Sequence, residues 1–138
     1  DMEALRKGLA DGTIDVVATD HAPHSAEEKS RGLAGSAMGV VGIETSLAAI
    51  YTFMVGGGVI SLERMVEVMS LRARRLLGLA GGLVVGERVD ATLVDFRSEY
   101  NVDTTTFLSK GRSTPFEGMR LRGEVDITIS AGRIVYEK

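Results

Sequence analysis

The sequence has 138 residues, of which 44% are hydrophobic and 25% are charged, and its formal net charge is −3. This balance is typical of one soluble globular domain and excludes a disordered chain, while the interspersed acids and bases offer no basic surface for nucleic acid. The lack of cysteine excludes disulfides and thiolate metal ligands. No apolar run is long enough to cross a bilayer and the first residues do not resemble a signal peptide, so we expect no membrane partner. The absence of cysteine fits a reducing cytoplasm, which is the location that we expect.

The first predicted elements are a helix and a buried strand. Met2, Leu5 and Leu9 share one helical face, and Gly12 is expected to end that helix. The run at 14–19, IDVVAT, is short, apolar and rich in β-branched residues, which is typical of a strand buried on both faces of a parallel sheet.

A loop over about 20–42 is expected to lead into a helical region. The helical signals, in chain order, are an apolar face at Ile43, Leu47, Ile50 and Met54 ended by the glycines at 56–58, a second helix capped by Ser61, and a helical segment over 70–79 stopped by GLAGG. The first part of the chain therefore reads as helix–strand units.

Beyond Gly82 the hydrophobic period changes to two. Alternation at 90–96 and 125–129 predicts two strands, and the tight turn at 130–132 predicts a hairpin with the last residues. The sequence thus divides near residue 82 into an α/β part, 1–82, and a small antiparallel part, 83–138.

The stretch TDHAPH, 19–24, places an acid directly after the predicted strand and contains both histidines of the chain. Because α/β barrels carry catalytic groups at the carboxyl ends of their strands, Asp20 is a candidate metal ligand or general base. His24 can meet an anionic substrate or serve as a ligand. The structural alternative is that Asp20 bonds loop amides and the histidines fill turn positions, and the spacing alone leaves both readings open.

Three stretches, TDHAPH, GVVGIET and STPFEG, together resemble the C-terminal part of class I dihydroorotases in the amidohydrolase superfamily. The resemblance runs through the whole chain to GRIVYEK. It implies an α/β fold in which 1–82 supplies the last strand and helices of a TIM-type (β/α)8 barrel. Residues 83–138 would then supply strands of a small accessory β-sandwich.

The resemblance also implies roles for particular residues. Asp20 matches the aspartate that binds zinc and acts as general base and acid for the hydrolytic water, and His24 matches the histidine that holds the substrate carboxylate. Ala37, Met38 and Gly39 match a stretch whose backbone contacts the substrate.

Two further details qualify these matches. Ser36 and Ala37 stand where the family usually has Ala-Pro, which bears on the rigidity of that loop. His21 matches a common family residue. We interpret it as structural or as a residue that contacts a metal ligand without binding the metal itself.

The implied activity is the reversible, zinc-dependent cyclisation of N-carbamoyl-L-aspartate to (S)-dihydroorotate in pyrimidine biosynthesis, with one or two zinc ions. The His-x-His motif, the lysine and the other histidines of the family's metal site do not occur here, so the 138 residues alone are expected to be inactive. The expected partners are the small-molecule substrate, the remaining N-terminal part of the enzyme, and a second copy or aspartate transcarbamoylase. Two alternatives stay open: a non-catalytic dihydroorotase-like subunit that scaffolds aspartate transcarbamoylase, and a related hydantoinase or allantoinase.

Overall fold

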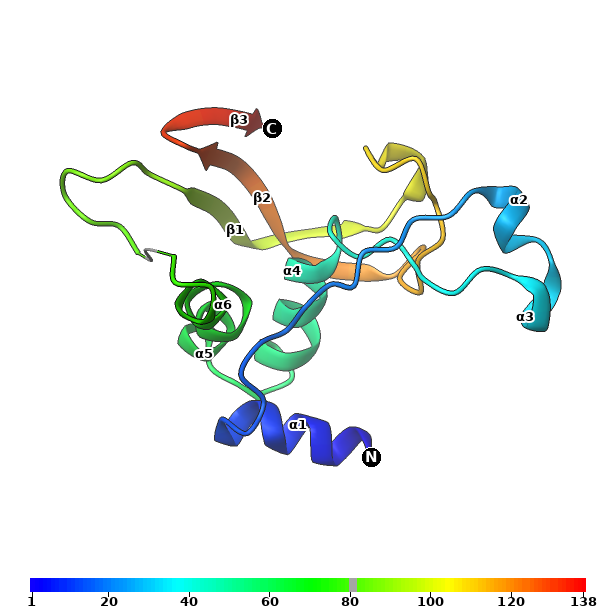
Figure 1. Ribbon diagram of the computed structural model, residues 1–138, viewed down its shortest axis with the longest axis horizontal. Helices are drawn as coiled ribbons and strands as arrows, with labels where there is room; N and C mark the ends of the chain where they lie inside the picture. The colour runs from blue at the N-terminus through cyan, green and yellow to red at the C-terminus, as the bar shows by residue number, and fades with distance from the viewer. Residues whose placement is uncertain (80–81) are drawn as a thin grey trace.

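A computed structural model describes residues 1–79 and 82–138 of the chain. Helices gather in the first half and strands in the second (Figure 1). In chain order the elements are α1 (Met2–Asp11), α2 (Ala26–Lys29), α3 (Gly32–Gly35), α4 (Ser46–Ile50), the π-helical segment η1 (Tyr51–Val55), α5 (Leu62–Val66), the π-helical segment η2 (Glu67–Leu71), α6 (Arg72–Leu76), β1 (Ala91–Asn101), the 3₁₀ turn η3 (Thr104–Thr106), β2 (Arg120–Ser130) and β3 (Arg133–Glu137).

The predicted first helix is confirmed as α1. Gly12 follows it with φ 93°, a left-handed conformation that costs glycine little and ends the helix. Of its apolar face only Leu9 is buried, whereas Met2 and Leu5 are 66% and 63% exposed. Leu9 packs α1 against the buried cluster of Ile60, Met65 and Val68, while Met2 and Leu5 remain exposed to solvent.

The predicted strand over 14–19 is wrong within the described part of the chain. The segment runs extended from α1 toward α2 (Figure 1), but no strand is assigned to it. Its amides instead bond to helices: Ile14 donates to the Gly8 carbonyl and Val17 to the Val68 carbonyl. A β-branched run favours extension and burial, but a ladder requires a neighbouring strand, and none of the described residues supplies one.

The helical region is confirmed, with fewer breaks than expected. α4 continues directly into η1, so the helix begins at Ser46 rather than Ile43, and it ends at the predicted glycines. The Ser61 side chain accepts from the Arg64 amide and caps α5 as predicted. α5, η2 and α6 then form one continuous run. Part of the predicted GLAGG stop lies outside the described residues.

The second half forms an antiparallel sheet in the order β1-β2-β3, as the alternating pattern predicted. Both long strands extend beyond the predicted ranges, and β1 pairs with β2 from Ala91–Ile129 to Asn101–Arg120. Ala131 and Gly132 form the turn of the β2–β3 hairpin, with φ 50° and 76°. Positive φ at both turn residues matches the right-handed twist of hairpin strands.

Two hydrophobic clusters hold the helices and the sheet together. In the first, Leu9, Ile60, Met65 and Val68 are buried, and Phe96 of β1 packs against them with its ring 4.3 Å from that of Tyr51. In the second, Ala48 and Ala49 of α4 meet Val102 and the fully buried Leu121 of β2. Burial of these apolar side chains is the main force that fixes the helices against the sheet.

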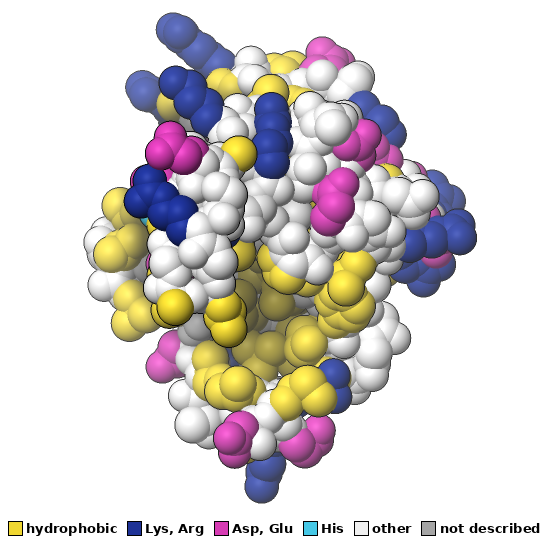
Figure 2. Space-filling model, turned by 90° about the vertical axis from the view of Figure 1, so that its right-hand side faces the viewer, with side chains coloured by type: hydrophobic (Ala, Val, Ile, Leu, Met, Phe, Trp, Pro, Cys, Tyr) yellow, Lys and Arg dark blue, Asp and Glu magenta, His cyan; other side chains and the backbone are white. Residues whose placement is uncertain are grey.

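The structure leaves several apolar surfaces uncovered. Every residue of β3 is exposed, including Ile134 at 59% and Val135 at 61%. Figure 2 shows a hollow on one face of the molecule whose walls are largely hydrophobic side chains. Across residues 1–79 and 82–138, no helix has the length and hydrophobicity that a membrane crossing requires.

Candidate active site

Asp20 lies at the end of the extended segment, in a strained backbone conformation. Its φ is 44°, in the left-handed region that a non-glycine residue adopts at a cost, although aspartate tolerates it better than most. Its side chain is exposed, and among the residues that the structure describes it accepts no hydrogen bond and forms no ion pair. The structural alternative, in which Asp20 bonds loop amides, is therefore not what the fold uses. Its carboxylate is available to a ligand.

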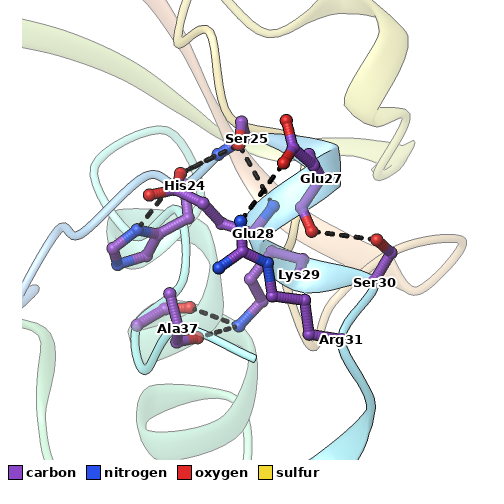
Figure 3. Close-up of polar contacts among 9 residues, drawn as sticks. His24, Ser25, Glu27, Glu28, Lys29, Ser30, Arg31 and Ala37 are labelled. Atoms are coloured by element: carbon purple, nitrogen blue, oxygen red, sulfur yellow. Dashed lines mark hydrogen bonds and ion pairs between the residues drawn. The ribbon is translucent and has the colours of Figure 1, made fainter. Parts of the chain in front are cut away.

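His24 lies two residues before the one-turn helix α2, beside an acid of that helix. The Nδ1 atom of His24 lies 3.7 Å from Oε2 of Glu28 (Figure 3). A Cβ placed on Gly39 would lie 3.3 Å from Nε2 of His24, so the other ring nitrogen faces the loop around Gly39. The ring is half-buried, with 27% of its side chain exposed. One nitrogen is engaged with protein and the other is directed at the predicted substrate loop.

Glu28 is itself fixed by the capping box of α2. Its carboxylate accepts from the backbone amide and the hydroxyl of Ser25, both at 2.9 Å, while the Ser25 hydroxyl accepts from the Glu28 amide. The hydrogen bond from the Ser25 amide contributes most to lowering the pKa of Glu28, and the bond from the Ser25 hydroxyl contributes next. The nearby His24 lowers this pKa further. Glu28 therefore faces His24 as a carboxylate.

The loop over 36–39 is tied to α2 through main-chain and side-chain bonds. The Ala37 amide donates to the Glu28 carbonyl at 3.1 Å, and the Ser36 hydroxyl donates to the Lys29 carbonyl at 2.8 Å. Neither bond is possible for an Ala-Pro pair, because alanine has no hydroxyl and proline has no amide hydrogen. Where this chain departs from the family pattern, it gains two bonds that hold the loop.

Lys29 adds two more bonds to the same loop. Its ammonium nitrogen donates to the carbonyls of Ala37 and Gly39, each at 2.9 Å (Figure 3). The Met38 side chain, in contrast, is 91% exposed. Within the described residues, the backbone amides of Met38 and Gly39 donate to no protein atom. These two amides are free to bind a ligand.

His21 bonds to the backbone of the GVVGIET segment. Its Nδ1 accepts from the amides of Gly42 and Ile43, at 3.2 and 3.4 Å. An accepting Nδ1 carries no proton, so in the neutral ring the proton resides on Nε2. His21 also pairs with Val40 in a parallel bridge, and Ala22 donates to the Val40 carbonyl at 3.0 Å. These contacts join the TDHAPH segment to the start of the GVVGIET segment.

The segment before STPFEG lies against the TDHAPH segment. A Cβ on Gly111 would lie only 2.7 Å from Cβ of Pro23, so the glycine permits close approach to the TDHAPH segment. Glu44 holds this loop by accepting from the amides of Leu108 and Ser109, at 2.8 and 3.1 Å. Partial burial acts to raise the pKa of Glu44, but the hydrogen bonds from Ser109 and Leu108 prevail and lower it.

The described residues do not assemble a metal centre by themselves. Across 1–79 and 82–138 there is no group of three or more His, Cys, Asp or Glu side chains placed to hold a metal ion. A zinc site in a hydrolase needs about three protein ligands. Asp20 could supply one, and the others would have to come from outside these residues.

Sequence reasoning identified Asp20, His24 and the 36–39 loop but missed the groups that position them. The pattern Ser25–Glu28 is a capping-box signature that could have revealed α2. Nothing local indicates Lys29, because its acceptors lie eight and ten residues further along the chain.

The candidate hydrolase site on this α/β scaffold consists of three features. They are the Asp20 carboxylate without a partner among the described residues, His24 beside Glu28, and the loop with the free amides of Met38 and Gly39. The chain belongs to the amidohydrolase family, whose family model matches residues 1–135. It is 47% identical over 138 residues to the dihydroorotase of Thermoanaerobacter sp. (strain X514), and 45% identical over 139 residues to that of Bacillus cereus (strain AH820). Each match covers 100% of this chain and 32% of the relative, so the chain spans about a third of their length.

Solved structures of hydantoinases share the fold. The L-hydantoinase (dihydropyrimidinase) from Arthrobacter aurescens superposes with a TM-score of 0.89 at 36% identity, over 97% of this chain and 31% of that one. The D-hydantoinase (dihydropyrimidinase) from Thermus sp. superposes with a TM-score of 0.90 at 26% identity, over 99% of this chain and 31% of that one. The family resemblance is thus confirmed at the level of sequence and of three-dimensional arrangement.

Proposed function

We propose that these residues form the C-terminal part of a longer dihydroorotase, which interconverts N-carbamoyl-L-aspartate and (S)-dihydroorotate in pyrimidine biosynthesis. Residues 1–82 would complete a (β/α)8 barrel and 83–138 would contribute to an accessory β-sandwich. The exposed β3 and the hydrophobic hollow of Figure 2 support this arrangement, because such surfaces are typical of sites that contact other polypeptide. The identities of 44–47% to dihydroorotases support the choice of substrate.

The observation that carries the proposal is the state of Asp20. Its carboxylate is exposed, lies at a strained turn and has no partner among the described residues. A fold that used Asp20 as a cap would satisfy it with amides. An unpaired acid at a strained position is instead typical of catalytic sites.

The roles follow from the chemistry of a cyclic amide. Asp20 takes a proton from the attacking water, the water oxygen adds to the ring carbonyl carbon, and the ring carbon–nitrogen bond breaks as the proton passes from Asp20 to the leaving nitrogen. His24 binds the substrate carboxylate, and the free amides of Met38 and Gly39 donate to the substrate. Cyclisation runs through the same steps in reverse.

We assign zinc as the metal, one or two ions, with Asp20 as one of its ligands. When bound, zinc makes water acidic enough to react at neutral pH. The remaining ligands would come from the part of the enzyme that precedes these residues. We also assign the protein to the cytoplasm, with a second copy or aspartate transcarbamoylase as possible partners.

The fold alone favours a second candidate, a hydantoinase, because the superposed structures are hydantoinases. Their identities of 26–36% are lower than those of the dihydroorotases, which favours dihydroorotate. A non-catalytic scaffold for aspartate transcarbamoylase would not need the free Asp20 carboxylate.

The test is turnover by the full-length enzyme with dihydroorotate, hydantoin and allantoin, together with its zinc content by mass spectrometry. We expect dihydroorotate to have the highest kcat/KM and zinc to be bound. A higher kcat/KM for hydantoin would favour the second candidate, and zinc-free protein without turnover would favour the scaffold.

A further inference from the structure

Lys29 is a charged side chain that the reaction does not use. It lies at the end of α2, it is half-buried, and its ammonium donates to two backbone carbonyls at 2.9 Å. Among residues 1–79 and 82–138, no carboxylate lies within ion-pair distance of it. Partial burial of a cation without an acid is costly unless other groups satisfy it, so these two carbonyls are its stabilising partners.

The two carbonyls belong to Ala37 and Gly39, in the loop whose amides we assign to substrate binding. The Ala37 carbonyl and the Met38 amide share one planar trans peptide, and in such a unit the C=O and N–H point in opposite directions. By holding the carbonyl, Lys29 turns the Met38 amide away from α2. The Lys29 ammonium, which binds the Ala37 carbonyl on the side of α2, therefore also sets the direction in which the Met38 amide points.

From this geometry we infer that Lys29 is a positioning residue, which orients the Met38 amide toward the substrate without contacting the substrate itself. The inference rests on the proposed function. It also explains how a glycine at φ 120° and an exposed methionine can form a defined binding loop. Without Lys29 the 37–38 peptide could rotate, and the donor would be lost for part of the time.

The test compares Lys29→Met with Lys7→Met in the full-length enzyme. Methionine keeps the apolar stem and removes the ammonium. Lys7 serves as the matched control, because it is an exposed lysine of α1 whose side chain forms no hydrogen bond or ion pair with residues 1–79 or 82–138. We expect Lys29→Met to raise KM for dihydroorotate about tenfold, the loss expected for a charge-assisted hydrogen bond. The kcat should change less than about threefold, because the affected contact is made in ground and transition states alike. Zinc content should be unchanged.

Several results would overturn the inference. A KM within about twofold of the wild-type value would show that Lys29 does not position the loop. A rise in KM accompanied by loss of zinc would show that Lys29 acts through the metal site instead. The Lys7→Met enzyme should have the KM of the wild type. An equal rise in KM for Lys7→Met would show that the effect comes from the loss of any positive charge rather than from Lys29 in particular.

Two further measurements separate this inference from the proposed function. If the wild-type enzyme does not act on dihydroorotate, the proposed function fails, and hydrogen exchange still tests Lys29. Lys29→Met should then speed exchange over residues 36–40 and Lys7→Met should not, while unchanged exchange would contradict a loop-holding role. If Lys29→Met does not fold, acetylation of the wild-type protein decides: Lys29 should react several times more slowly than Lys7, and equal reactivity would refute the inference.

Discussion

Gly39→Ala tests how closely the proposed substrate loop must lie against the TDHAPH segment. Gly39 has φ +120°, which side chains rarely adopt. A Cβ at this position would lie 2.5 Å from Cβ of Ala22, 2.9 Å from the Ala22 carbonyl oxygen and 3.3 Å from Nε2 of His24. The first two contacts are with Cβ and the backbone carbonyl of Ala22, which cannot move aside as the end of a flexible side chain could.

The geometry sets the size of the effect. The loop must retreat by about 0.9 Å, the difference between 2.5 Å and the 3.4 Å at which ordinary contact begins. A misplacement of about 1 Å in a positioning element can cost roughly 10²-fold in rate. The unfavourable φ adds a loss of stability of about 1–3 kcal/mol. We therefore expect kcat/KM to fall about 10²-fold in a protein that still folds.

The assay is steady-state turnover of the full-length enzyme with denaturant unfolding alongside. Gly58→Ala is the matched control, because Gly58 also has a positive φ, +70°, but a Cβ there would meet nothing within 4 Å. It should lose stability and keep its activity. Adding Ala22→Gly to Gly39→Ala removes the shortest contact and should restore part of kcat/KM. The reasoning fails if Gly39→Ala and Gly58→Ala have the same kcat/KM.

Three other changes separate catalysis, binding and stability. Asp20→Asn should lower kcat by about 10² to 10⁴-fold and reduce bound zinc while the protein still folds, and near-normal turnover would exclude Asp20 as the base. His24→Ala should raise KM with unchanged zinc content, since a charge-assisted bond is worth about 1.5–3 kcal/mol, and an unchanged KM would leave His24 a structural role. Glu44→Gln should be less stable than the wild type at neutral pH, because the lowered pKa of Glu44 means that folding favours its carboxylate. That contribution is present above the ordinary value of 4.5 and is lost as the pH falls through the lower folded value, so the two unfolding curves should converge in acid.

Local chemistry made much of the fold predictable. Gly12 ends a helix because it accepts a positive φ, and Ser61 caps one because its hydroxyl reaches the Arg64 amide. The hairpin followed from alternation around a turn at 130–132. Each of these features depends on residues within a few positions of one another.

The features that could not be predicted depend on distant partners. The run at 14–19 has the composition of a buried strand, yet the described residues offer it helices instead of a neighbouring strand. Ile43 has the right spacing for a helical face but lies outside α4, 60% exposed. Lys29 would have passed for a solvated lysine, because the carbonyls that hold it come from a loop whose path no local pattern fixes.

The two histidines of the chain illustrate how surroundings decide the role of a side chain. The Nδ1 of His21 faces two backbone amides, so it must accept, and the ring serves the backbone. The Nδ1 of His24 faces the carboxylate of Glu28 at 3.7 Å, where a donor is favoured. A neutral ring with its proton on Nδ1 would present an accepting Nε2 to the loop around Gly39 and would repel a substrate carboxylate. An anion binds there only when Nε2 carries a proton and can donate it to the carboxylate. The group that each Nδ1 faces, two backbone amides or one carboxylate, thus gives the two rings different roles.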